Sequence, residues 1–208
     1  MDKKRASTTR IGDHSQSSRH LYAWGVNTEG HLGLGHNINQ PNPSLINNSQ
    51  WKQIAAGETY ILAIREDDSL WVWGNNSNLP QPIAPESTGW KQVSAAYNNI
   101  IAIKTDGTLW DLTDQPKQLS TEQWEQIATG YDYTIAIRKD GSLWSYGFND
   151  DGQLGLGHTK DTITLNQIGT ATNWRLISAA PDYAFGIQED GSLWAWGDNS
   201  CEQLGLGD

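Results

Sequence analysis

The chain has 208 residues, a formal net charge of −10 and 37% hydrophobic residues, so we expect a packed core rather than a wholly disordered chain. Its single cysteine, Cys201, excludes an internal disulfide framework and a zinc site made of cysteines alone. No apolar run has the length of a signal h-region or of a ~20-residue membrane span, so we expect a soluble, cytoplasmic protein.

Residues 1–20 are predicted to form a disordered polar leader. They contain five of the fourteen basic residues and only two of the twenty-four acidic residues, so the remainder of the chain is strongly acidic. An acidic body repels phosphate backbones at long range, and we therefore expect no nucleic-acid partner and no membrane partner. A basic protein partner would suit such a surface.

The eleven tryptophans fall into two repeated frames. The frame Leu-Trp-x-Trp-Gly, or a close variant of it, occupies residues 21–25, 70–74, 109–112, 143–147 and 193–197. The frame Trp-x-x-Ile/Val occupies residues 51–54, 90–93, 124–127 and 174–177. Since every tryptophan belongs to one of the two frames, we interpret the tryptophans as framework residues rather than as a scattered aromatic site.

A short apolar run lies between the two frames, at residues 60–65, 99–104, 133–138 and 183–188. Three of these runs lead into Asp-Gly, which favours a hairpin because glycine accepts a positive φ without steric cost. Each unit therefore contains three good strands, and a weaker fourth is expected near residues 43–46, 82–84, 115–119 and 163–168. Repeated units of four antiparallel strands indicate an all-β fold, the β-propeller, with aromatic residues filling the seams between sheets.

The units span residues 21–69, 70–108, 109–142 and 143–192, with a partial unit at 193–208. The long units carry Gly30-His-Leu-Gly-Leu-Gly35 and Gly152-Gln-Leu-Gly-Leu-Gly157, and a similar segment lies near the end of the chain. These glycines lack the Lys-Ser/Thr of a phosphate loop, and no helix is expected after them. We therefore interpret each segment as a flexible connection between strands.

The sequence resembles the repeat of the regulator-of-chromosome-condensation family. The resemblance covers about residues 21–208 and is carried by residues 190–208 and 51–57. The resemblance implies a propeller, usually of seven blades, in a family that includes a nucleotide exchange factor for a small GTPase, a plant light sensor and many interaction domains. The Gly-Trp-Arg-His-Thr motif of the light sensor is absent. The family often has histidine immediately before the apolar strand, whereas the slot here holds Tyr60, Asn99, Tyr133 and Tyr183.

Seven blades of roughly 50 residues need about 350 residues, and this sequence supplies about four blades of such a ring. Three interpretations remain open. We favour the first, in which the sequence is a piece of a longer protein. The second is a ring assembled from two chains, and the third is an open arc or a small closed ring. An arc would expose sheet faces at both ends, and we then expect self-association through those ends.

No residue pattern predicts an active site, a cofactor or a metal centre, and the acidic pairs lie at turns where aspartate is favoured for local hydrogen bonding. We therefore predict a non-catalytic protein-interaction module. The alternative, implied only by the resemblance, is guanine-nucleotide exchange on a small GTPase. An exchange factor would need a wedge loop, and no unit carries a distinctive insertion.

The best candidates for partner binding are the turns before the apolar strands, because equivalent turns of a propeller gather on one face. Tyrosine supplies rigid contact area there and asparagine supplies adaptable hydrogen bonds. The third residue of each turn could instead be buried framework, whereas Tyr97 and Tyr131 are expected to be exposed. The candidates are Glu58, Thr59, Tyr60, Tyr97, Asn98, Asn99, Tyr131, Asp132, Tyr133, Pro181, Asp182 and Tyr183.

Overall fold

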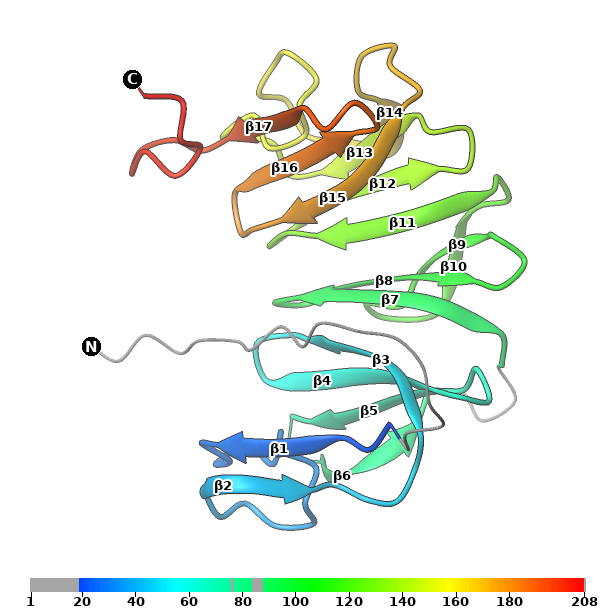
Figure 1. Ribbon diagram of the computed structural model, residues 1–208, viewed down its shortest axis with the longest axis vertical. Helices are drawn as coiled ribbons and strands as arrows, with labels where there is room; N and C mark the ends of the chain where they lie inside the picture. The colour runs from blue at the N-terminus through cyan, green and yellow to red at the C-terminus, as the bar shows by residue number, and fades with distance from the viewer. Residues whose placement is uncertain (1–18, 76, 84–87, 208) are drawn as a thin grey trace.

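The computed structural model describes residues 19–75, 77–83 and 88–207. The predicted leader at residues 1–20 therefore lies almost entirely outside the described residues. Within these ranges all extended regular structure is β-strand, arranged in successive antiparallel sheets from the bottom to the top of Figure 1. The prediction of an all-β fold of propeller type is confirmed.

Three sheets have four strands each, and their strands follow one another in chain order. The two outermost sheets are smaller, with two strands in the first and three in the last. The first sheet contains β1 (Tyr22–Gly25) and β2 (Gln40–Leu45), and the last contains β15 (Trp174–Ala179), β16 (Tyr183–Gln188) and β17 (Leu193–Gly197). The repeat units defined from the sequence begin at the third strand of a sheet, whereas each four-stranded sheet begins at its first strand. Units and sheets therefore have the same period but different boundaries.

The four-stranded sheets contain the predicted strands in the predicted order. The first comprises β3 (Trp51–Ala56), β4 (Tyr60–Arg65), β5 (Leu70–Gly74) and β6 (Ser77–Pro82). The second comprises β7 (Trp90–Ala96), β8 (Asn99–Lys104), β9 (Leu109–Asp111) and β10 (Lys117–Ser120). The third comprises β11 (Trp124–Thr129), β12 (Tyr133–Arg138), β13 (Leu143–Gly147) and β14 (Thr162–Gln167).

The fourth strands are the least accurately predicted. Strand β6 ends at Pro82, where the predicted strand was expected to begin, because the connection after Gly74 is very short. Proline is tolerated in β6 because this strand is the last in its sheet and has a free edge. Residue 84, the end of the predicted strand, lies outside the described residues.

Tryptophans fill the seams between sheets, as predicted. The first residues of β7, β11 and β15 are buried against the second and third strands of the preceding sheet. Each also meets a tryptophan of its own third strand edge to face, with ring centroids 6.1–6.3 Å apart. Burial of such large aromatic faces, with favourable edge contacts, is a major stabilising contribution at each seam. The three seam residues are Trp90, Trp124 and Trp174.

The first strands of neighbouring sheets contact one another, and glutamine side chains join them. The Gln53 amide accepts a hydrogen bond from Val93 N at 2.9 Å and donates one to Val93 O at 3.0 Å. Gln92 makes the same pair of bonds with Ile127, both at 3.1 Å. Gln126 repeats the pattern with Ile177. These glutamine bridges hold the sheets in register, and the turns that follow the first strands therefore lie side by side.

The glycine-rich connection of the third sheet is anchored rather than loose. The amide of the buried Asn149 donates to His158 O at 2.7 Å and accepts from Leu154 N at 2.9 Å. The indole of Trp196, from the next sheet, donates to Gln153 O at 2.9 Å. The segment connects two strands, as predicted. Its shape is fixed rather than flexible, because the side chains of Asn149 and Trp196 bond to its backbone.

Candidate partner-binding face

The four candidate turns lie between the first and second strands of their sheets, on one face of the arc. Two contacts tie three of the turns together. The rings of Tyr97 and Tyr131 stack with centroids 4.4 Å apart, and Tyr131 N donates to Pro181 O at 3.1 Å. We call the surface formed by residues 58–60, 97–99, 131–133 and 181–183 the tyrosine face.

The third residue of each turn is mainly framework. Tyr60 and Tyr133 are buried, and burial raises the pKa of the Tyr60 hydroxyl to about 12. The Tyr133 hydroxyl lies 2.9 Å from Ala180 O and 2.5 Å from Tyr183 O, so its one proton is shared between two carbonyl acceptors of the next sheet. Tyr60 and Tyr133 are therefore withdrawn from the surface that a partner can touch, which corrects their place among the contact candidates.

The remaining third residues are half-buried. The Asn99 amide reaches the next sheet and donates to Tyr133 O at 2.8 Å and to Thr134 Oγ1 at 3.3 Å. Tyr183 packs edge to face on Phe185, with centroids 5.8 Å apart. Both side chains are thus occupied by contacts within the protein, and each keeps only part of its surface accessible.

The first and second residues of the turns supply the accessible surface. Tyr131 is 42% exposed, as expected, whereas Tyr97 was also expected to be exposed and is instead half-buried, because its ring stacks on that of Tyr131. Tyr97 has a φ of 48°, in the left-handed region that a bulky residue seldom adopts. The stack on Tyr131 holds it in this conformation. The other residues of this group are the exposed Glu58, Asn98, Asp132 and Pro181 and the half-buried Thr59 and Asp182.

Two hollows flank Tyr131. The inner hollow, of about 340 Å³, has a floor of small residues contributed by the ends of the first strands. The outer hollow, of about 190 Å³, is lined by Tyr131, Asp132, Phe148, Gln153 and Asp182. Tyr131 therefore forms a wall between an apolar hollow and an acidic one.

The backbone around the outer hollow is fixed by a close approach at Gly147. This glycine has a φ of 119°, and a Cβ there would lie 2.4 Å from Asp132 O. The approach allows Phe148 N to donate to Asp132 O at 3.0 Å. Only glycine fits this position, and its presence sets Phe148 beside Asp132.

The carboxylates of the tyrosine face are close enough to affect one another. Desolvation raises the pKa of Asp182, and the negative charges of Asp151, Asp198 and Asp132 raise it further. Desolvation, with the nearby Tyr97 and carboxylates, likewise raises the pKa of Tyr131. None of these four aspartates forms an ion pair with a basic side chain among the residues that the structure describes. The face therefore carries negative charge without a local counter-charge.

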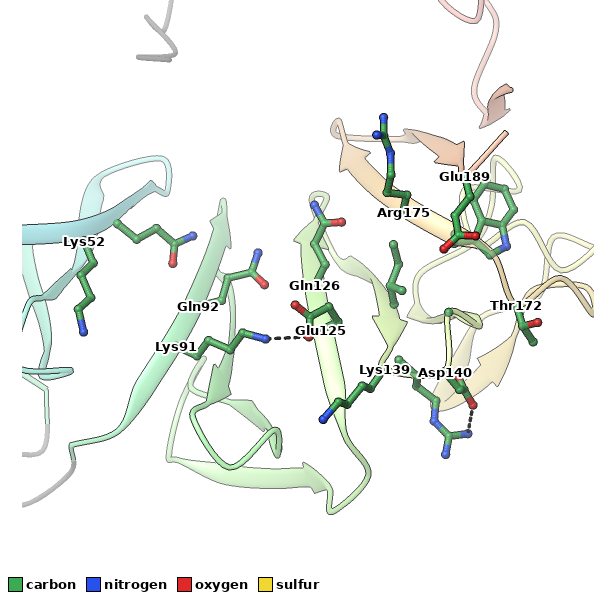
Figure 2. A pocket seen from close by; sticks show the side chains of 15 residues that line it. Lys52, Lys91, Gln92, Glu125, Gln126, Lys139, Asp140, Thr172, Arg175 and Glu189 are labelled. Atoms are coloured by element: carbon green, nitrogen blue, oxygen red, sulfur yellow. Dashed lines mark hydrogen bonds and ion pairs between the residues drawn. The ribbon is translucent and has the colours of Figure 1, made fainter. Parts of the chain in front are cut away.

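The opposite face of the arc gathers cations that the sequence analysis missed. Figure 2 shows Lys52, Lys91, Lys139 and Arg175 around a hollow of about 650 Å³. Three of the four directly follow a framework tryptophan, and Lys139 directly follows β12, so the repeat register was the signal that could have found them. Two of these charges are neutralised locally. The Lys91 ammonium lies 3.0 Å from a Glu125 oxygen, and Lys52 pairs with Asp68.

The geometry defines an arc of a β-propeller with one acidic, aromatic face. Two models of the regulator of chromosome condensation (RCC1) repeat match the sequence, one at residues 20–64 and 140–178 and the other at 51–78 and 124–153. Together they cover more than half of the chain. The chain belongs to the RCC1 repeat family.

Solved structures share this fold at low sequence identity. Prp20p from Saccharomyces cerevisiae, studied for its binding to Gsp1p and histones, has a TM-score of 0.79 and 21% identity, over 92% of this chain and 56% of that chain. Yeast RCC1 (Prp20) bound to Kap60 has a TM-score of 0.77 and 18% identity, over 99% and 62%. Human WBSCR16 has a TM-score of 0.75 and 17% identity, over 83% and 54%. The chain thus spans a little over half the length of these proteins.

No curated protein sequence matches the chain. In the described part of the chain there is no helix with the length and apolar character needed to cross a membrane.

Proposed function

We propose that this protein is a non-catalytic interaction module that binds a protein partner through the tyrosine face. The observation that carries the proposal is the stacked pair of Tyr97 and Tyr131, one of them held in the left-handed region and the other 42% exposed. Rigid aromatic side chains are favoured as contact residues because they bury much area and lose little conformational entropy.

The face is also built on a rigid support. The glutamine bridges join the first strands of successive sheets, and the bond from Tyr131 N to Pro181 O joins two of the turns. A surface that does not reorganise on binding loses little conformational entropy, and this favours the complex. One yeast protein of this fold, Prp20, was studied for its binding to Gsp1p and histones and was solved bound to Kap60, which agrees with this kind of role.

The test is affinity capture from cell extract with the whole chain as bait. Tyr131→Ser should reduce the recovery of the true partner by roughly 30-fold, the loss expected for a binding hot spot of about 2 kcal/mol. Leu79→Ser is the control, because Leu79 is 50% exposed on β6 and belongs neither to the tyrosine face nor to the two terminal sheets. A set of captured proteins that depends on Leu79 and not on Tyr131 would contradict the proposal.

Nucleotide exchange on a small GTPase is the alternative that family membership suggests. A release assay with a fluorescent guanine nucleotide loaded on the GTPase separates the two functions. We expect nucleotide release at the rate of the GTPase alone, since binding through the tyrosine face does not require displacement of a nucleotide. Acceleration that depends on catalytic amounts of the chain would replace the interaction module with an exchange factor.

A further inference from the structure

The outer hollow of the tyrosine face combines two aromatic rings with two carboxylates. Tyr131 and Phe148 are 42% and 43% exposed, so two large apolar rings face the solvent within one small hollow. Asp132 and Asp182 line the same hollow. Exposed aromatic surface of this kind marks binding sites more often than it occurs by chance on a monomer.

The two carboxylates have no counter-ion of their own. Neither forms an ion pair with a basic side chain within the described ranges. Desolvation and the charges of Asp151, Asp198 and Asp132 raise the pKa of Asp182, so the folded protein holds this charge at a cost. A cation in the hollow would remove that cost, and no basic side chain of the described residues pairs with either carboxylate there.

The chemistry of the hollow favours an organic cation over a metal ion. Among the described residues, no group of three or more histidine, cysteine or acidic side chains is placed to hold a metal. Aromatic rings contribute nothing to the oxygen coordination of a hard metal ion, but they attract organic cations through the face of the ring.

We infer that the outer hollow binds the guanidinium group of an arginine in a basic segment of the protein partner. This inference rests on the proposed function of the tyrosine face and specifies its ligand. A guanidinium is planar, stacks on aromatic rings and forms forked hydrogen bonds with carboxylates, whereas the lysine ammonium is a strongly hydrated point charge. The acidic surroundings, which include Glu58, Asp151 and Asp198, suit further basic residues of the same segment.

The hollow is formed before any ligand arrives. Phe148 N is bonded to Asp132 O, and Asp198 N is bonded to Asp182 O at 2.9 Å. The buried side chain of Gln153 accepts from Asp151 N at 3.0 Å and thereby fixes the floor. These bonds fix the backbones of Asp132 and Asp182 through their carbonyl oxygens, and the carboxylate oxygens take no part in them.

The experiment measures the fluorescence anisotropy of a labelled peptide with the sequence Ser-Gly-Arg-Gly-Arg-Gly-Ser, titrated with the full chain at low ionic strength. Two further peptides replace both arginines, one with citrulline and the other with lysine. Citrulline keeps the shape of arginine without its charge. We expect the arginine peptide to bind at least about tenfold more tightly than the citrulline peptide and several-fold more tightly than the lysine peptide.

The variants locate the binding. Asp182→Asn should weaken the arginine peptide about tenfold, because it removes one carboxylate of the hollow. Glu189→Gln is the matched control, since Asp182 directly precedes β16 and Glu189 directly follows it, at the cationic end of Figure 2. Both variants remove one negative charge, so a change in net charge alone would weaken binding equally. Tyr131→Phe should retain binding, and Tyr131→Ser should lose it.

Each outcome decides the inference. Equal effects of Asp182→Asn and Glu189→Gln, or equal affinity for arginine and lysine peptides, would overturn it. Circular dichroism and thermal unfolding confirm that each variant is folded. The proposed function fails separately, when partner capture does not depend on Tyr131. A partner captured through Tyr131 without any arginine selectivity would refute only the guanidinium site.

Discussion

At the scale of single residues, aspartates perform two opposite tasks in this protein. In the turn between β12 and β13, Asp140 accepts hydrogen bonds from Ser142 N and Ser142 Oγ, and Ser142 Oγ accepts one from the Trp144 indole at 2.8 Å. The bonds from Ser142 lower the pKa of Asp140. Asp182, in contrast, has a raised pKa among other carboxylates. The first kind of aspartate stabilises the fold, and the second lies on the proposed binding face.

Substitution of the two aspartates should therefore change stability in opposite directions. Asp140→Asn should lower the free energy of unfolding at pH 7 by about 1 kcal/mol, because charged acceptors make the stronger hydrogen bonds. Asp182→Asn should raise the melting temperature slightly at pH 7, because it removes an unfavourable charge. Thermal unfolding at pH 7 and pH 3 checks both.

The pH dependence has a definite sign for each residue. The lowered pKa of Asp140 gives stability that is present above the ordinary pKa of 3.8 and is lost as the pH falls below it. The raised pKa of Asp182 gives a penalty at neutral pH that disappears as the carboxyl is protonated below its raised value. Asp182→Asn should approach the unmodified protein near pH 3, whereas the deficit of Asp140→Asn should shrink only as the pH falls through the lowered pKa of Asp140. A loss of stability in Asp182→Asn at pH 7 would show that this carboxylate is a framework residue.

At the scale of elements, the glutamine bridges link the first strands of neighbouring sheets, which have no backbone hydrogen bonds to one another within a sheet. Each glutamine side chain offers one donor and one acceptor to the backbone of the next first strand, as a neighbouring strand would. Strand β15 holds Leu176 in the equivalent position, and this side chain is 46% exposed. The last sheet of the arc therefore offers no such bridge.

Removal of one bridge should measurably weaken the protein. Gln92→Ala leaves Ile127 N and O without their partners in a partly buried seam, at a cost of about 1–3 kcal/mol in the free energy of unfolding. Gln118→Ala, on the exposed face of β10, is the control and should change stability by less than about 0.5 kcal/mol. Urea denaturation compares the two, and equal midpoints would show that the bridges do not contribute.

The strands were largely predictable because each depends on local signals. The tryptophan frames, the apolar runs and the Asp-Gly turns all fix short segments independently of the rest. The glycine-rich loops were less predictable, because their anchors come from another unit. Gly155 lies against the Trp196 indole, which donates to Gln153 O. The sequence nevertheless contained a signal, since Trp73 and Trp196 follow the two units with such a loop, whereas Leu112 and Tyr146 follow the units without one.

The candidate site was predictable only in part. The exposure of Tyr131 follows from its place at the tip of a turn. The outer hollow could not be derived from the sequence, because Phe148 enters it from a different connection than Asp132 does, through the approach at Gly147. The burial of Tyr60 and Tyr133 depends on the neighbouring sheet, which the turn sequence alone does not describe.

At the scale of the whole molecule, the first and last sheets lie at opposite ends of the arc (Figure 1). Each end exposes apolar side chains. Leu193 and Trp194 of β17 are 65% and 53% exposed, and Tyr22 and Trp24 of β1 are 51% and 53% exposed. The last sheet has three strands, so among the described residues no strand pairs with the outer edge of β17. Free edges and apolar faces of this kind promote association.

This chain, prepared as its 208 residues, should therefore self-associate through its ends. Size-exclusion chromatography with light scattering should give masses that increase with concentration to at least twice 23.0 kDa. Leu193→Lys should shift the distribution towards the monomer, because a charge on the exposed β17 disfavours edge pairing. A stable monomer at all concentrations, in both proteins, would contradict the expectation.

Hydrogen–deuterium exchange of the full chain, with and without the arginine peptide, tests whether the tyrosine face binds the peptide. We expect slower exchange at residues 97–99, 131–133 and 181–183. Exchange should be unchanged at residues 105–108, 139–142 and 189–192, which lie at the other ends of the same second strands. Protection confined to those opposite turns would show that the tyrosine face is not the binding face.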